Sequence, residues 1–255
     1  MTQSFSYESS RLLGEYLLLH FGGGADLRHP SLPVAEEITA VPFPVRCVRE
    51  LLDTTLLPPE ATALEAGCAV GGAAFELART CISVTAGDFS QSFIHAARNL
   101  VRDGCMQTLR SVEGTTTIPF TATVPPEIDR DRVRFEVQDA TALPAGIGPF
   151  DVVLAANLIC RLPDPEAFLS RLPGLVKPGG QLLLTTPFTW LEEFTPQKKW
   201  VGGLMDGPSC EEELTRRLHP DFRLHRRIDL PFLIREHQRK YQLGVALGTC
   251  WIRKP

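Results

Sequence analysis

Several features that identify other classes of protein are missing from this sequence. Its seven cysteines are scattered and no two form a Cys-x-x-Cys pair, which argues against a disulfide framework or a structural zinc site. No apolar run approaches the roughly 20 residues of a membrane-spanning helix. Glu8, Arg11 and Glu15 interrupt the apolar residues near the N-terminus, which is not the pattern of a secretory signal. We therefore expect a cytoplasmic protein.

An excess of positive charge is missing too. The chain has 26 Lys and Arg against 30 Asp and Glu, a formal net charge of −4. Such a chain has no general attraction to nucleic acid or anionic lipid, and it contains no basic groove interleaved with aromatic residues. His20, His29, His95 and His219 do not have metal-ligand spacing. We expect no nucleic acid, no membrane and no metal among its partners.

The chain contains instead a repeated alternation of short strands and helices. We predict strands at residues 61–66, 82–87, 133–137, 150–155 and 181–186, and helices at 12–20, 45–52, 73–80, 91–100, 165–175 and 210–218. Residues 222–252 are typical of two further long strands around a short turn or helix. The pattern indicates an α/β fold, in which a mostly parallel seven-stranded sheet carries helices on both faces.

The most informative stretch is the glycine-rich turn LEAGCAVGG at residues 64–72, which joins the first predicted strand to a helix. An open α/β sheet binds a nucleotide-like ligand at this turn, where Gly67 and Gly71 let the backbone approach the ligand. Ala69 occupies the position of the second glycine of a dinucleotide-binding fingerprint, which argues against NAD. The spacing of Glu65, Gly67 and Gly71 resembles instead the first motif of class I S-adenosylmethionine-dependent methyltransferases, whose cofactor has no phosphates.

Further elements of this family follow in the expected order. Asp88 ends the second strand, where an acidic residue can accept both ribose hydroxyl hydrogens. The family places an acid or amide against the adenine amino group after the third strand, and a residue near the methyl group after the fourth. The resemblance implies a Rossmann-like fold that binds S-adenosylmethionine and releases S-adenosylhomocysteine. The cofactor-binding residues that it implies are Glu65, Gly67, Gly71, Asp88, Phe89, Asp139, Ala140 and Asn157.

The outer segments resemble a narrower family. YESSRLLGEYLL at 7–18, PFPVRC at 42–47, WLEEFTP at 190–196 and FLIREHQRKY at 232–241 are similar to the 5-thiohistidine (4-mercaptohistidine) N-methyltransferases of ovothiol biosynthesis. In many members this domain is the C-terminal part of a larger enzyme that begins with an iron-dependent sulfoxide synthase. That part is absent here, so the resemblance implies a stand-alone methyltransferase supplied by a separate sulfoxide synthase and a lyase.

This resemblance implies a specific reaction. A methyl group passes from S-adenosylmethionine to the imidazole π nitrogen of 5-thiohistidine, which gives ovothiol A; the selenium analogue, 5-selenohistidine, would react in the same way. The protein mainly has to align a nitrogen lone pair with the methyl group and to exclude water. Two alternatives stay open at this point: methylation of another small molecule, such as a thiol, amine or quinone, and a non-catalytic binding protein with the same fold.

We expect a single domain, residues 1–255, that contains three regions. Residues 1–60 form an N-terminal helical approach or lid. Residues 61–186 form the cofactor-binding core, interrupted by an inserted β-hairpin within 107–131. Residues 187–255 form a cap over the substrate and the closing strands.

An amino-acid substrate needs a partner for its carboxylate and for its ammonium group once both are desolvated. Arg46 is the first candidate for the carboxylate, and Arg11, Arg235 and Lys240 are its competitors. Glu192 or its neighbour Glu193 is the candidate for the ammonium group.

The remaining substrate candidates are aromatic or titratable. Tyr7, Tyr16 and Tyr241 are candidates for a lid over the substrate, and Trp190 is a candidate for a wall of its site. Asn157 could orient the imidazole ring of the substrate, and His237 or Glu236 could transfer a proton. Structural alternatives exist for three of these side chains: Arg11 and Glu15 match an ordinary helix-surface pair, Tyr16 matches a core residue, and Trp190 and Trp200 match anchors of an irregular segment.

Overall fold

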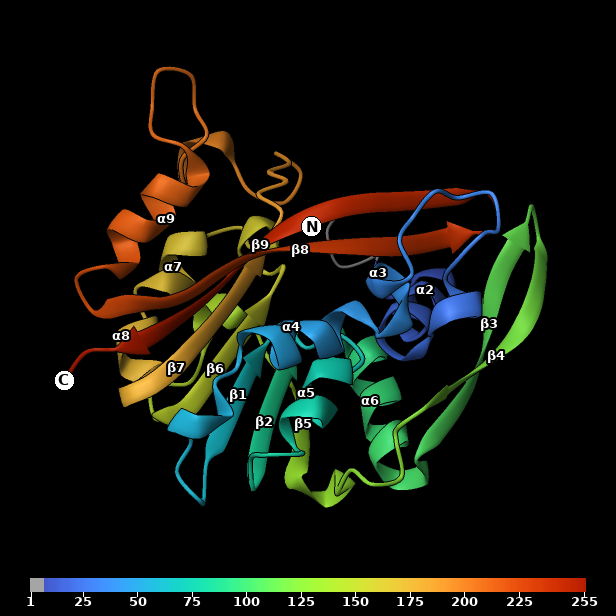
Figure 1. Ribbon diagram of the computed structural model, residues 1–255, viewed down its shortest axis with the longest axis horizontal. Coiled ribbons are helices and arrows are strands. Elements are labelled where there is room, and N and C mark those ends of the chain that lie inside the picture. Colours follow the sequence, from blue (N-terminus) through green and yellow to red (C-terminus); the bar gives the residue numbers. More distant parts are fainter. Residues whose placement is uncertain (1–6) are drawn as a thin grey trace.

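One mixed sheet of seven strands forms the centre of the structure, a computed structural model that describes residues 7–255 (Figure 1). Its order is β5-β2-β1-β6-β7-β9-β8. The strands are β1 (Thr62–Ala66), β2 (Ser83–Asp88), β5 (Val133–Val137), β6 (Phe150–Ala156), β7 (Val176–Thr186), β8 (Phe222–His237) and β9 (Lys240–Arg253). The first five are parallel to one another, whereas β9 is antiparallel to both β7 and β8. The predicted Rossmann-like, mostly parallel seven-stranded sheet is confirmed.

Helices cover both faces of this sheet (Figure 1). They are α2 (Ser10–Phe21), α3 (Glu37–Ala40), α4 (Phe43–Leu51), α5 (Gly72–Leu77), α6 (Gln91–Asp103), α7 (Pro165–Leu169), α8 (Leu172–Leu175) and α9 (Cys210–Leu218). Ser90 caps α6 through its side-chain oxygen, and Ser209 forms a capping box with Glu212 at the start of α9. Among residues 7–255, no helix combines the length and the apolar character that crossing a membrane requires.

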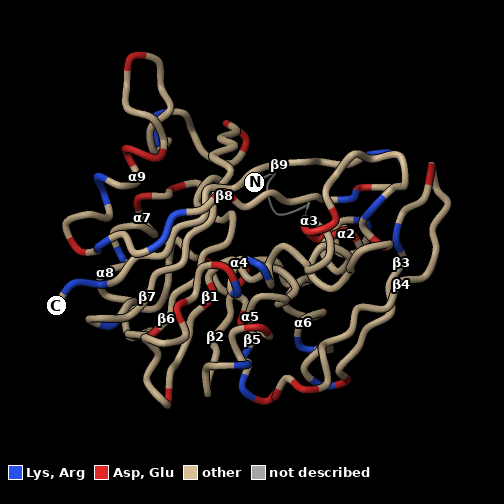
Figure 2. The backbone as a smooth tube through the Cα atoms, viewed as in Figure 1, with Lys and Arg blue, Asp and Glu red and all other residues tan. Residues whose placement is uncertain are grey.

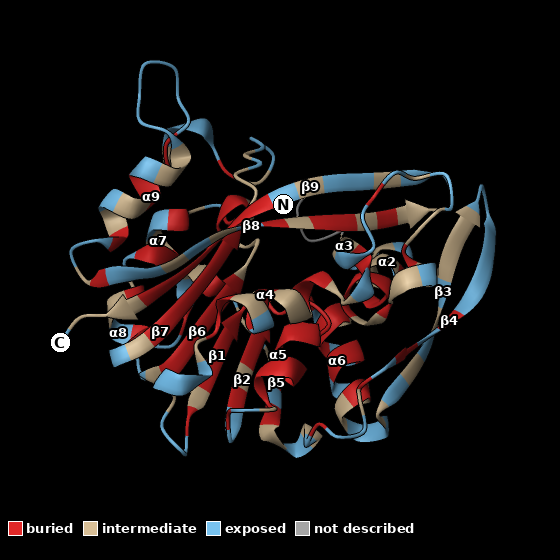
Figure 3. Ribbon diagram, viewed as in Figure 1, coloured by how far each residue is buried: buried red, intermediate tan, exposed pale blue. Residues whose placement is uncertain are grey.

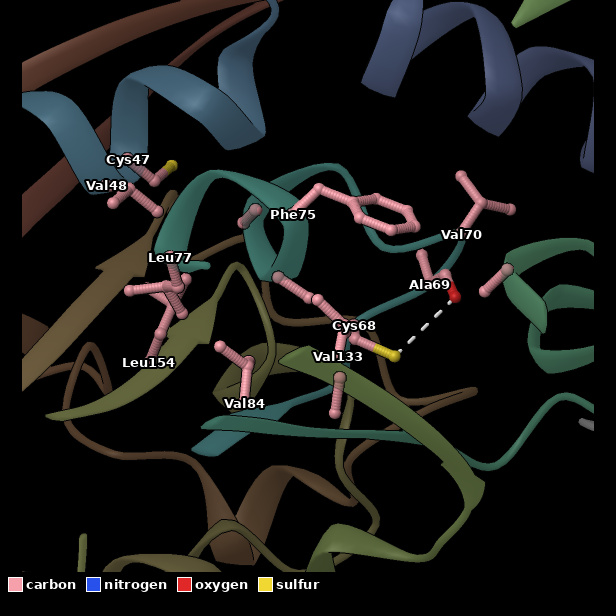
Figure 4. Close-up of a cluster of buried hydrophobic side chains, with 14 of the residues drawn as sticks. Cys47, Val48, Cys68, Ala69, Val70, Phe75, Leu77, Val84, Val133 and Leu154 are labelled. Atoms are coloured by element: carbon pink, nitrogen blue, oxygen red, sulfur yellow. Dashed lines mark hydrogen bonds between the residues drawn. The ribbon is translucent and has the colours of Figure 1, made fainter. Parts of the chain in front are cut away.

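Two apolar clusters fill the spaces between the sheet and the helices, and the central strands are buried throughout (Figure 3). The larger cluster joins Leu17 of α2 and Phe75 of α5 to Leu230 of β8. Figure 4 shows Cys68 of the glycine-rich turn in this cluster, with its sulfur 3.6 Å from the Ala69 carbonyl oxygen. The other cluster places Trp251 of β9 against the helices of the opposite face.

The inserted segment forms a separate two-stranded sheet of β3 (Cys105–Glu113) and β4 (Thr116–Thr123). The predicted hairpin is therefore correct, although it begins before residue 107 and ends well before residue 131. The long β8–β9 ribbon extends beyond the main sheet toward this hairpin (Figure 1), and the N–H of Gln238 at its tip donates to the Val112 carbonyl. Between them lies α2.

Two predicted boundaries are wrong for physical reasons. The helix predicted over 165–175 is two short helices, because Pro173 lies in the first turn of α8, a position that proline tolerates at the start of a helix but not inside one. The strand predicted at 181–186 begins at Val176, so that the Pro178-Gly179-Gly180 stretch lies inside β7. Its pairing with β6 is irregular there, between Phe150 and Val152.

Candidate functional site

A cavity of about 450 Å³ opens at the carboxyl ends of the central strands. The order of the strands reverses between β1 and β6, and ligands of open α/β sheets bind at such a point. Glu65 from β1, Asp88 from β2 and Asn157 after β6 all line the cavity. Its volume is that of a site for small molecules.

The glycine-rich turn between β1 and α5 forms one wall. Gly67 lines the cavity with φ +73°, and a Cβ atom there would lie 2.7 Å from Leu158 Cδ1. Gly71 has φ +90° and packs against the Phe135 ring, so it shapes the turn without lining the cavity. Ala69, at the position of the missing glycine, also has a positive φ of +46°. The backbone of the turn can thus pass close to a ligand in the cavity, as the glycine motif predicts.

Two buried acidic side chains lie at the floor of this turn. Asp88 Oδ2 accepts from the Ala69 N–H at 2.9 Å and Oδ1 accepts from the Ser90 N–H at 2.9 Å. Glu65 is 1% exposed, and its Oε2 atom has no hydrogen-bond partner among the described residues. Burial raises the pKa of both carboxyls, and the nearby charge of Asp88 raises the pKa of Glu65 further. Such a pair favours a cationic or hydroxyl-bearing ligand.

The next wall follows β5. Asp139 and Ala140 line the cavity, and Asp139 Oδ1 accepts from the Thr141 N–H at 2.8 Å. Gln138 also lines it, and the Gln138 Oε1 atom is buried without a partner among the described residues. Phe89, after β2, is 47% exposed and lies edge-on to Tyr7, with ring centroids 5.4 Å apart.

Asn157 is held in an uncommon backbone conformation, with φ +51°. Its N–H donates to the Thr185 carbonyl at 2.8 Å, and the Thr185 hydroxyl donates to Asn157 Oδ1 at 2.9 Å. The Thr185 hydroxyl thus fixes the orientation of the amide, whose Nδ2 group is the part of this side chain that can donate to a ligand.

The N-terminal helix α2 covers the cavity from above the turn. Tyr7 and Tyr16 line the cavity, and their rings lie edge-on to each other with centroids 6.3 Å apart. Burial raises the pKa of both phenols. His20 also lines the cavity, and burial lowers its pKa to about 3, so its ring is neutral at neutral pH. His20 Nδ1 accepts from the Gly72 N–H at 3.0 Å.

Sequence reasoning missed one charged side chain of the cavity, Arg161. It is the only Arg or Lys among the described residues that line the cavity. Its Nη1 donates to the Thr189 carbonyl at 2.8 Å, and its guanidinium carbon lies 5.0 Å from the centroid of the Phe194 ring. Its position in the sequence could have indicated a place in the site, since Arg161 follows the same strand end as Asn157. His20, Cys160, Phe194 and Phe232 were missed as well.

The basic residues predicted to hold a carboxylate lie outside the cavity, and each has another partner. Arg46 pairs with Glu50 at 2.7 Å and donates to the Pro231 carbonyl. Arg11 pairs with Glu15 at 2.9 Å, which matches the helix-surface alternative. Arg235 donates to the Asp26 carbonyl at 2.6 Å, and Lys240 pairs with Glu236 at 2.6 Å. We therefore remove all four from the candidate substrate site.

Other predicted substrate residues are also displaced. Trp190 stacks on Trp200, with ring centroids 6.2 Å apart, and donates to Cys210 Sγ, as an anchor would. Glu192 lies exposed in a turn, not in a strand. The Tyr241 hydroxyl donates to the Gln238 carbonyl, on the ribbon.

The two proton-transfer candidates lie on the ribbon as well. Glu236 accepts from Gln242 Nε2 at 2.8 Å, and its pairing with Lys240 holds its pKa below the ordinary value. His237 Nδ1 accepts from the Arg239 N–H at 3.2 Å, and His237 lines a smaller hollow with Arg11 and Lys240. Neither side chain lines the cavity, because the ribbon presents Phe232, Ile234 and Gln242 to it instead.

Charges of both signs are dispersed along the chain (Figure 2). Within residues 7–255, no cluster of three or more His, Cys, Asp and Glu side chains is arranged to hold a metal ion.

The core of the chain is similar in sequence to known proteins. Residues 64–182 match the family described as a methyltransferase domain. The chain is 31% identical over 143 residues to the ubiquinone biosynthesis O-methyltransferase of Xanthomonas axonopodis pv. citri, which covers 56% of this chain and 49% of that protein. It is 28% identical over 172 residues to the 2-methyl-6-phytyl-1,4-hydroquinone methyltransferase of Synechocystis, covering 67% of this chain and 44% of that one. The chain thus spans about half the length of these relatives.

Two solved structures share the fold over most of the chain. The N-methyltransferase NodS from Bradyrhizobium japonicum, in complex with S-adenosylhomocysteine, has a TM-score of 0.54 at 15% identity and covers 95% of this chain and 98% of that one. The magnesium protoporphyrin IX methyltransferase from Synechocystis, with bound S-adenosylmethionine, has a TM-score of 0.50 at 16% identity and covers 83% and 76%. These likenesses concern the fold.

Proposed function

We infer that this chain, whose residues 64–182 match the methyltransferase-domain family, is a class I S-adenosylmethionine-dependent methyltransferase that acts on a small-molecule acceptor. We also propose that it works as a single domain, because one apolar cluster joins Leu17, Phe75 and Leu230 from its N-terminal, central and C-terminal parts.

The cavity fits S-adenosylmethionine at its acidic end. The partnerless Oε2 atom of Glu65 is a buried acceptor that suits a cationic group of the cofactor. Asp88 is fixed by two backbone N–H groups, so its remaining lone pairs can accept from ribose hydroxyls. A Cβ atom at Gly67 would crowd this wall. Asp139 lines the same cavity, and we propose its carboxylate as the acceptor for the adenine amino group. The bound cofactor supplies an electrophilic methyl group on a sulfonium.

For the acceptor, we propose 5-thiohistidine or 5-selenohistidine, methylated on the imidazole π nitrogen to give ovothiol A or its selenium analogue. One observation carries this proposal: each of the four outer segments that resemble the 5-thiohistidine N-methyltransferases contributes side chains to the cavity wall. These side chains are Tyr7 and Tyr16 from the first segment, Phe43 and Pro44 from the second, Phe194 from the third, and Phe232 and Ile234 from the fourth.

These side chains orient the acceptor and exclude water. The aromatic rings present flat apolar faces to an imidazole. Thr185 orients the Asn157 amide through its bond to Oδ1, and the Nδ2 group can donate to the acceptor. His20 is neutral and its Nδ1 is already bonded to Gly72, so it is poorly placed to act as a base. We therefore propose that the acceptor enters as the tautomer whose π nitrogen carries the lone pair, and that a sulfoxide synthase and a lyase supply it.

A quinol or phenol is the second candidate acceptor, because two relatives are named for quinone and hydroquinone methylation and the cavity wall is rich in aromatic side chains. A panel assay separates the two: the purified protein, S-adenosylmethionine, and either 5-thiohistidine, 5-selenohistidine or a catechol, with products identified by mass spectrometry. Methylation of the catechol alone would overturn the thiohistidine proposal. Calorimetry that detects no S-adenosylhomocysteine binding would favour a non-catalytic protein instead.

A further inference from the structure

Arg161 is the one Arg or Lys among the described residues that line the cavity, whose other charged side chains are acidic. Among the described residues that line the cavity, the acidic side chains are Glu65, Asp88 and Asp139, and the only guanidinium is that of Arg161. Glu65 and Asp88 lie at the ends of β1 and β2 and Asp139 lies just after β5, whereas Arg161 lies after β6. The cavity therefore has an acidic end and a basic end, and a ligand that spans it experiences opposite charges at the two ends.

The guanidinium is fixed in place but its charge is not paired. Nη1 donates to the carbonyl oxygens of Cys160 at 3.1 Å and Thr189 at 2.8 Å, and the group lies over the Phe194 ring. None of these partners is a carboxylate. The Nε and Nη2 atoms donate to none of the described residues, and this edge is the one that binds a carboxylate through two parallel hydrogen bonds. Arg46, Arg11 and Arg227 each have a carboxylate partner instead.

We propose that Arg161 binds the carboxylate of an α-amino-acid acceptor and so selects acceptors that carry one. This inference rests on the proposed function and adds the group that recognises its substrate. The acceptor ring then lies among Tyr7, Phe194 and Phe232, with its carboxylate at the basic end. An acceptor without a carboxylate leaves the Arg161 charge desolvated and unpaired, which costs binding free energy.

The cofactor carries a carboxylate as well, so the anion has two possible sources. We assign the acceptor as the source because the contacts that hold Arg161 come from the neighbouring Cys160 and from the segment after β7, at Thr189 and Phe194, and not from the glycine-rich turn. A residue that binds the acceptor affects acceptor binding alone, whereas one that binds the cofactor affects S-adenosylhomocysteine binding.

The experiment compares wild type, Arg161→Met, Arg161→Lys and a matched control, Arg171→Met. Arg171 also donates to two carbonyl oxygens, those of Leu143 and Pro144, but lies outside the cavity. Calorimetry measures the binding of S-adenosylhomocysteine to each protein, and then of 5-thiohistidine or its decarboxylated analogue, 5-thiohistamine, to each complex. Initial rates with both acceptors give KM.

Wild type should bind 5-thiohistidine at least about tenfold more tightly than 5-thiohistamine, the usual effect of a charge-assisted pair. Arg161→Met should abolish this difference, Arg161→Lys should keep part of it, and Arg171→Met should keep all of it. Binding of S-adenosylhomocysteine should stay within about twofold in every variant, as expected for residues that do not touch the cofactor.

Three results would overturn the assignment: equal binding of the two acceptors by wild type, an unchanged preference in Arg161→Met, or a loss of S-adenosylhomocysteine affinity in Arg161→Met that Arg171→Met does not share. The proposed function fails separately. If 5-thiohistidine binds through Arg161 but is not methylated, the proposed function is refuted and the role of Arg161 stands. If Arg161→Met methylates 5-thiohistidine with the same KM as wild type, the role of Arg161 is refuted and the proposed function stands. No binding and no methylation would refute both.

Discussion

The Nδ1 atom of His20 accepts a hydrogen bond of 3.0 Å from the backbone N–H of Gly72, and this bond joins the N-terminal helix α2 to the first residue of α5. A Cβ atom at Gly72 would lie 2.9 Å from the same nitrogen, so the two elements are in close contact. The His20 ring also stacks beside Tyr16, with centroids 6.0 Å apart. The helix that covers the cavity is thus fastened to the turn that shapes it.

This arrangement predicts that stability depends on pH through His20. Burial lowers the pKa of His20 from its ordinary 6.5 to about 3, so between these values the unfolded chain binds a proton that the folded one does not. The stabilisation of the fold by a neutral His20 is fully present above pH 6.5. As the pH falls toward 3, this stabilisation is lost, and the free energy of unfolding decreases by about 1.4 kcal/mol per pH unit. Urea unfolding of wild type and His20→Asn across this range measures it.

The variant keeps an acceptor near the Gly72 N–H but cannot be protonated, so its free energy of unfolding should fall less steeply with decreasing pH. His95→Asn, on the exposed face of α6, is the matched control and should follow the wild type. Parallel curves for wild type and His20→Asn would contradict the assignment of a buried neutral ring.

Two buried glutamates should respond in opposite ways to replacement by glutamine. Glu65 has an unpartnered oxygen and a raised pKa, so its charge destabilises the ligand-free fold at neutral pH. Glu65→Gln should raise the free energy of unfolding and weaken S-adenosylhomocysteine binding by about tenfold or more, since a charged acceptor is lost. Chemical denaturation and calorimetry measure the two effects.

Glu76 provides the comparison, because it is also buried but pairs with Arg49 at 2.7 Å and Arg79 at 2.9 Å. Glu76→Gln should lower the free energy of unfolding and leave S-adenosylhomocysteine affinity unchanged. If Glu65→Gln binds S-adenosylhomocysteine as tightly as wild type does, Glu65 is not a cofactor residue.

Gly71→Ala should destabilise the protein by roughly 2–4 kcal/mol. The new Cβ atom would meet the buried Phe135 ring, and φ at +90° is unfavourable for any residue with a side chain. Thermal unfolding measures the loss. Gly174→Ala is the control, because it lies in α8 with open space around the new Cβ atom, and it should be neutral or slightly stabilising. Equal effects at the two sites would refute the steric argument.

Thr185 should control the orientation of the Asn157 amide. Thr185→Val removes the hydroxyl that donates to Asn157 Oδ1, so the amide can rotate and the Nδ2 group is no longer directed at the acceptor. We expect kcat to fall by about tenfold or more, as for other misplaced positioning groups, with unchanged S-adenosylhomocysteine affinity. Steady-state kinetics and calorimetry measure these values.

Thr185→Ser retains the hydroxyl and should restore most of the activity. Thr249→Val is matched in burial and removes a hydroxyl that donates to the Leu184 carbonyl, away from Asn157, so kcat should stay near the wild-type value. A loss in Thr249→Val as large as that in Thr185→Val would show that the effect comes from the sheet and not from Asn157.

The alternation of strands and helices was sufficient to predict the sheet, because hydrophobic periodicity and glycine turns are local properties of the chain. The same is true of the cofactor end of the site: Glu65, Gly67, Asp88 and Asp139 stand at strand ends, which a parallel sheet brings to one edge. A local pattern therefore specified a three-dimensional arrangement.

The acceptor end was not predictable in the same way. Arg46, Arg235 and Tyr241 lie in segments that reach the cavity, but their side chains point to other partners. Which side of a strand or helix faces the cavity depends on long-range packing, such as the pairing of β8 with β9. Arg161 follows the same strand end as Asn157, but its sequence position alone does not show whether its side chain faces the cavity or the solvent.

The most direct test of the account is to supply the purified protein with methyl-labelled S-adenosylmethionine and 5-thiohistidine and to locate the label in the product by nuclear magnetic resonance. The account predicts one methyl group on the imidazole π nitrogen, formed together with S-adenosylhomocysteine. A label on sulfur or on the other ring nitrogen, or no labelled product from a protein that binds the cofactor, would contradict it.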